Sequence, residues 1–132
     1  MSRACFLPIL LIGAISLASR SSELATPEIG LDFSPDKIGH FLIFGLLATL
    51  IVRLDKFRKK RRKGAVAAVI CVCLFALIDE FHQSFTPGRL VEAADLLADL
   101  LGAALAVFCY HGSQKDRKLL EWSANRKNGS NT

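Results

Sequence analysis

The sequence predicts an all-α fold: a polytopic membrane protein in which four transmembrane helices form a compact bundle. Hydrophobic residues make up 52% of the 132 positions, which is more than a soluble domain usually contains. Uncharged segments alternate with short polar ones, and the basic residues gather beside the apolar segments, as they do at the cytoplasmic flanks of membrane helices. A chain of this length forms one domain at most.

The first predicted helix covers about residues 4–20 and has two interpretations. The run from Ala4 to Ser19 is uncharged. A cleaved signal peptide would show the same short basic start, apolar core and small residues, here Ser16 and Ala18. We expect the helix to be retained, because three later segments need a fourth one to return both termini to the same side.

The second predicted helix covers about residues 35–53, and a basic loop follows it. Pro35 suits the first position of a helix, and Asp36 suits the positive end of the helix dipole. Eight of the 17 Lys and Arg residues fall between Arg53 and Lys63. Under the positive-inside rule this loop is cytoplasmic.

The third and fourth predicted helices cover about residues 64–83 and 90–111, with a turn at Thr86-Pro87-Gly88 between them. These helices complete a membrane domain of residues 1–111. The polar tail, residues 112–132, is expected to be cytoplasmic and disordered. We therefore expect a multi-pass membrane protein with both termini in the cytoplasm.

Charged residues occur within the predicted spans, at similar depths on three helices. Counting ~1.5 Å per residue from the basic ends, carboxylates reach one level just below the outer surface of a ~30 Å hydrocarbon layer. Ionisable groups inside a membrane segment indicate a functional site. This upper level holds Asp36, Asp79, Glu80 and Asp95. A second level, closer to the cytoplasm, pairs His40 with Asp99. The helical spacings place Asp36 with His40, Glu80 with Gln83, and Asp95 with Asp99 on shared faces.

One ordered pattern runs through the last three helices: Asp36-Lys37-x-x-His40, Glu80-x-x-Gln83, Arg89 and Asp95-x-x-x-Asp99-x-x-Gly102. Over roughly residues 10–110 it resembles the VanZ-like family of small bacterial membrane proteins. The founding member is associated with low-level resistance to the glycopeptide teicoplanin. The resemblance therefore implies a four-helix protein of the cell envelope, in the bacterial cytoplasmic (inner) membrane. Asp99 stands where the family more often has asparagine, and Phe44 where it often has tyrosine.

Two kinds of function fit these residues, and the sequence leaves open whether the protein is an enzyme. The first is an outward-facing acidic site that binds or modulates an envelope lipid, a cell-wall precursor or a glycopeptide antibiotic. The second is a membrane-embedded enzyme that acts on a lipid-linked or phosphorylated amphiphile. Crowded acids in a low dielectric cannot all be ionised, so one would serve as a general acid beside a general base. The candidate catalytic residues are Glu80, His40 and Asp95. The candidate substrate-binding residues are Asp36, Lys37, Gln83, Arg89 and Asp99.

Other partners and chemistries have less support in the sequence. Ion or proton transport would use the acids as a relay, but four short helices without an inverted repeat do not favour a transporter. No cofactor is expected; a divalent metal on His40 and nearby acids stays open by ligand type, although no recognised metal motif is present. Membrane lipids are expected partners. Nucleic acid is not, because no aromatic-interleaved basic surface or recognition motif occurs.

Overall fold

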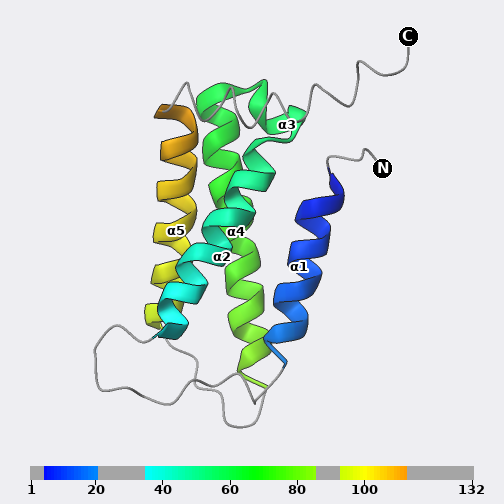
Figure 1. The fold of residues 1–132 in the computed structure, drawn as a ribbon, viewed down its shortest axis with the longest axis vertical. Helices are drawn as coiled ribbons and strands as arrows, with labels where there is room; N and C mark the ends of the chain where they lie inside the picture. Colours follow the sequence, from blue (N-terminus) through cyan, green and yellow to red (C-terminus); the bar gives the residue numbers. More distant parts are fainter. Residues whose placement is uncertain (1–4, 21–34, 86–92, 113–132) are drawn as a thin grey trace.

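The computed structural model describes residues 5–20, 35–85 and 93–112, and every regular element in these ranges is a helix. The elements are α1 (Phe6–Ala18), α2 (Pro35–Val52), α3 (Asp55–Arg58), α4 (Arg61–Gln83) and α5 (Ala93–Gly112). Figure 1 shows α1, α2, α4 and α5 running lengthwise beside one another, with α3 at one end. The predicted all-α fold is thereby confirmed.

The short helix α3 lies inside the predicted basic loop and was not expected from the sequence. Asp55 occupies its first turn, while Lys56 and Arg58 occupy its last. Each charge therefore faces the end of the helix dipole that favours it. The following helix, α4, begins at Arg61, earlier than the predicted start at 64, so part of the basic segment is helical.

Two of the four predicted membrane spans, α4 and α5, are long and apolar enough to cross a bilayer. The other two are shorter: α1 has 13 residues, and the apolar part of α2 runs from Lys37 to Val52. A span perpendicular to the membrane needs ~20 residues. These two helices fall short because α1 ends at Ala18 and α2 begins with charged residues.

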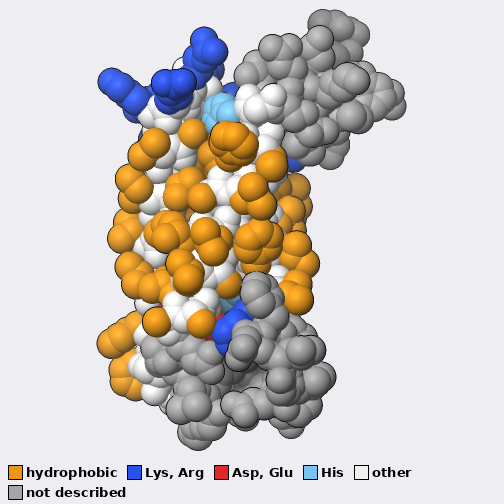
Figure 2. Space-filling model, turned by 90° about the vertical axis from the view of Figure 1, so that its left-hand side faces the viewer, with side chains coloured by type: hydrophobic (Ala, Val, Ile, Leu, Met, Phe, Trp, Pro, Cys, Tyr) orange, Lys and Arg blue, Asp and Glu red, His pale blue; other side chains and the backbone are white. Residues whose placement is uncertain are grey.

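The exterior of the bundle is apolar along all four long helices. Figure 2 shows a belt of hydrophobic side chains between the two ends, with Lys and Arg gathered at the upper end. Large side chains such as Leu42, Leu74 and Leu105 are about half exposed or more. A soluble monomer rarely exposes so large an apolar patch, and this surface therefore indicates association with a membrane.

The interior is made of small residues and a few larger ones. One face of α4 buries Gly64, Ala68 and Ala76, which lets neighbouring backbones approach closely, as in membrane bundles. The most extensive helix contact is between α2 and α5. There, Gly102 lies directly against the backbone of Phe41, and a Cβ atom on Gly45 would lie 3.1 Å from the carbonyl oxygen of Gly102.

Candidate functional site

Four carboxyl groups are buried at the end of the bundle opposite α3. Exposed fractions are 2% for Asp79, 8% for Glu80, 5% for Asp95 and 2% for Asp99. The first two come from the end of α4 and the others from the beginning of α5, because these antiparallel helices meet there (Figure 1). Burial of a carboxylate carries a large desolvation cost unless it is paired. The contacts around the acids are therefore what define this site.

His40 of α2 and Asp99 of α5 are in direct contact, at the depth where the sequence pairs them. His40 Nδ1 lies 3.0 Å from Asp99 Oδ1. The imidazole stacks on Phe44, one turn further along α2, and Phe44 stacks in turn on Phe75 of α4. Asp99 and the aromatic stack therefore hold the imidazole from two sides. With Nδ1 protonated, His40 donates this hydrogen bond to Asp99.

Lys37 and Asp95 form a second pair between the same two helices, one turn nearer the end of the bundle. Lys37 Nζ lies 3.8 Å from Asp95 Oδ1, with side-chain exposures of 22% and 8%. Residues three or four apart on a helix share a face, so this pair stacks above His40 and Asp99. The two pairs form a polar seam along the contact between α2 and α5.

A separate polar network joins α1 to α4. Ser19 Oγ lies 2.8 and 2.7 Å from the two carboxyl oxygens of Asp79, and Gln83 Nε2 donates to Asp79 Oδ2 at 2.9 Å. Ser19 Oγ is also 2.9 Å from the carbonyl oxygen of Ile15. The sequence interpretation did not include Ser19 as a site residue. It grouped Gln83 with Glu80, whereas the structure brings Gln83 to Asp79.

The remaining site residues are placed only in part. Glu80, the predicted proton-transfer residue, is buried in the last turn of α4, next to Asp79. Asp36 is the second residue of α2, but its side chain lies outside the described residues, as does Arg89. Among the residues that the structure describes, no three His, Cys, Asp or Glu side chains are arranged to hold a metal ion.

The two departures from the family pattern have a structural explanation. An asparagine at position 99 would keep an oxygen that can accept a hydrogen bond from His40 Nδ1, so either residue can orient the imidazole. Phe44 is 1% exposed and packs between His40 and Phe75. A tyrosine there would place its hydroxyl in this buried environment and would need a hydrogen-bond partner.

A helical bundle with an apolar exterior, small residues between its helices and buried acids at one end defines a membrane-associated protein with a polar site. A family profile described as VanZ/LLP1 matches residues 6–114. The match covers most of the chain, and the chain therefore belongs to the VanZ/LLP1 family, as the motif pattern predicts.

Comparison with curated proteins finds an uncharacterized protein of Schizosaccharomyces pombe. It is 33% identical over 89 residues, which are 65% of this chain and 54% of the yeast protein. The chain thus spans about half the length of this relative. No solved structure matches the chain.

Proposed function

We propose that this protein spans a membrane four times and that its buried acids form a binding site near the face opposite the basic loop. The ligand is the polar part of an envelope amphiphile: a lipid headgroup, a lipid-linked cell-wall precursor or a glycopeptide antibiotic. The protein binds this group or changes its access to the envelope. The observation that carries the proposal is the burial of four carboxyl groups at one end of a bundle whose exterior is apolar.

Four spans account for the distribution of apolar and polar residues better than two. All four long helices expose large apolar side chains, which the hydrocarbon of a membrane would cover favourably. The apolar parts of α1 and α2 are short, but these helices can still cross the membrane if their polar ends lie within the span and face the inside of the bundle. Ser19 and Lys37 fit this arrangement, because both hold carboxyl groups of neighbouring helices.

Cysteine accessibility tests the proposed topology, in which α3 and the basic residues face the cytoplasm. The four native cysteines are first replaced by alanine. Single cysteines are then placed at Ser84 and Lys60, which are exposed at opposite ends of the bundle. We expect a membrane-impermeant maleimide to label the Ser84 position in intact cells and the Lys60 position only after permeabilisation. The reverse pattern would contradict the orientation, and labelling of both positions in intact cells would contradict the spans.

The chemistry of the cluster favours a ligand that donates hydrogen bonds. Four acids lie buried together, and the described contacts supply Lys37, His40, Ser19 and Gln83 as partners. A carboxylate has several acceptor sites, and hydrogen bonds to it are stronger than those between neutral groups, so a headgroup with amine, amide or hydroxyl donors suits a cluster of acids. A peptide or sugar headgroup offers such donors.

A lipid and cell-wall-precursor profile tests whether Glu80 is needed. Cells express wild type, Glu80→Gln or the control His82→Gln at matched membrane abundance; His82 lies on the same turn but is exposed. We expect wild type and His82→Gln to retain the same amphiphile after purification, or to change survival in teicoplanin equally. Glu80→Gln should lose this effect, because the amide removes one acceptor and the charge. Equal behaviour of wild type and both variants would contradict the proposal that Glu80 belongs to a binding site.

Catalysis is the second candidate, and the contact between His40 and Asp99 favours it. A carboxylate that orients an imidazole is a common general-base arrangement, and the buried Glu80 lies at the same end of the bundle. In this case the profile would contain a new product with wild type that Glu80→Gln does not form. Retention of an unchanged amphiphile would support binding instead.

A further inference from the structure

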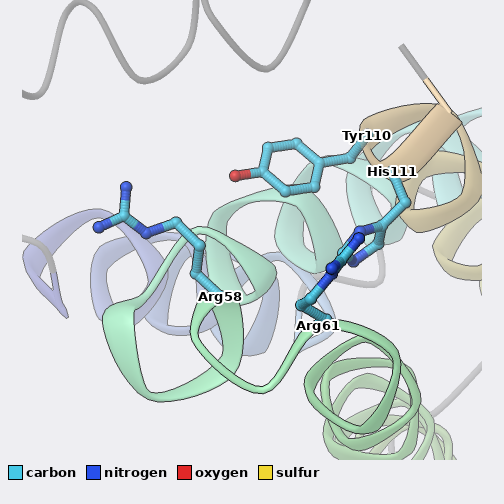
Figure 3. A pocket seen from close by; sticks show the side chains of 4 residues that line it. All are labelled: Arg58, Arg61, Tyr110 and His111. Atoms are coloured by element: carbon cyan, nitrogen blue, oxygen red, sulfur yellow. The ribbon is translucent and has the colours of Figure 1, made fainter. Parts of the chain in front are cut away.

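A pocket lies at the basic end of the molecule, opposite the acid cluster, where α3, the start of α4 and the end of α5 meet. Its volume is about 300 Å³, and it is lined by Arg58, Arg61, Tyr110 and His111. Figure 3 shows the Tyr110 ring extending over the pocket, between Arg58 on one side and Arg61 with His111 on the other. None of these residues belongs to the acid cluster.

Both arginines are able to engage an anion. Arg58 pairs with Asp55 at 2.7 Å, but their side chains are 41% and 70% exposed. An exposed ion pair between residues three apart contributes little stability, so a more highly charged anion can share the guanidinium. Arg61 is exposed at the first residue of α4 and has a left-handed backbone (φ 46°), a conformation that is uncommon for a residue with a side chain.

The other two lining residues and the α4 terminus add further donors. Tyr110 is 3% exposed, and its hydroxyl can donate a hydrogen bond into the pocket. Arg61 is the first residue of α4, so the positive end of the dipole of this 23-residue helix lies beside the pocket, an arrangement that favours phosphate. Two guanidinium groups, an imidazole and a phenol on a single pocket match the oxygens of one phosphate group.

We propose that this pocket binds the phosphate of an anionic lipid headgroup in the leaflet beside the basic loop. Lys and Arg gather at this end, directly beyond the apolar belt (Figure 2), which is the level of lipid headgroups. Anionic lipids of the cytoplasmic leaflet attract such basic segments. The pocket is at the small end of the range for ligand sites, so it holds a headgroup while the acyl chains lie along the apolar exterior.

Lipid binding by the purified full-length protein tests the proposal. The probe is fluorescent phosphatidic acid in detergent micelles, and zwitterionic phosphatidylcholine, which has no net charge, is the comparison. We expect Arg61→Gln to weaken phosphatidic acid binding about tenfold, because a charge-assisted hydrogen bond contributes roughly that factor. Arg61→Lys should fall in between, because it keeps the charge but loses the bidentate geometry. Tyr110→Phe should weaken binding severalfold without changing the charge.

The matched control is Lys56→Gln, which removes one positive charge from α3 at an exposed residue outside the pocket lining. We expect it to change binding less than about twofold, as a screened surface charge should. If Lys56→Gln and Arg61→Gln weaken binding equally, only diffuse surface charge is involved and the proposal is wrong. It is also wrong if millimolar inorganic phosphate displaces the lipid, since the site would then take free phosphate. Retention of the lipid in excess phosphate supports it. Neither outcome bears on the acid cluster at the other end.

Discussion

Replacing Gly102 by alanine is expected to separate α2 from α5 and to lower the stability of the bundle. The new Cβ would overlap the carbonyl group of Phe41, and backbone cannot rotate aside as a side chain can. Overpacking of this kind costs about 1–3 kcal/mol, which exceeds the gain of up to about 1 kcal/mol from better helix propensity. The measurement is the apparent Tm in detergent.

Gly39→Ala is the matched control for this prediction. Gly39 lies on α2, and a Cβ there would meet nothing within 4 Å, so the same chemical change should leave the Tm unchanged or raise it. Gly102→Ala should also disturb the contact of His40 with Asp99, which lies less than one turn from Gly102 on α5. Equal Tm values for the two variants would show that α2 and α5 are not held at the observed distance.

Much of the helical framework could be predicted because charge and hydropathy change sharply at its boundaries. The basic run from Arg53 marks the connection between α2 and α4. The carboxylates mark the end of α4 and the beginning of α5, which lie at the other end of the bundle. The short helix α3 could not be predicted with the same means. It has four residues, too few for a hydrophobic period, and its one acid, Asp55, lies within a mostly basic segment.

The polar contacts could be predicted from the sequence only where the two residues lie at the same depth along neighbouring helices. His40 and Asp99 meet because they lie at one depth on two helices that a glycine brings together. The contact of Ser19 with Asp79 depends instead on how far α1 and α4 are rotated about their axes, which an apolar sequence does not specify. The sequence did contain a sign of the contact between Gln83 and Asp79. These residues are four apart, and residues three or four apart share a helix face, so Gln83 could have been grouped with Asp79 as well as with Glu80.

The two ends of the bundle differ in the charge that they offer. One end buries carboxyl groups among helices, and the other lines an accessible pocket with arginine. Membrane proteins commonly gather positive charge at one end of their helices, so the number of basic residues at this end, as distinct from the pocket that some of them line, has a general explanation. The buried acids have no such general explanation, because topology does not require them and their burial is costly. This contrast is why we assign the principal site to the acidic end.

The second large effect is expected from the pair His40 and Asp99. Asp99→Val should lower the free energy of unfolding by about 1–3 kcal/mol, because Nδ1 of His40 then loses its partner in a buried environment. Asp99→Asn should cost less than about 1 kcal/mol, since its amide oxygen still accepts from Nδ1–H. The measurement is denaturant unfolding in mixed micelles, followed by circular dichroism.

Adding His40→Phe to Asp99→Val distinguishes a functional pair from a structural one. The phenyl ring can keep the stack on Phe44, and an apolar pair of similar size is often as stable as the buried polar pair it replaces. We therefore expect the double variant to recover most of the lost stability and still to retain no amphiphile in the profile experiment. If it regains both stability and function, the pair serves only to join α2 to α5. If it stays as unstable as Asp99→Val alone, the unpaired imidazole is not the source of the loss, and the buried contact contributes less than its geometry indicates.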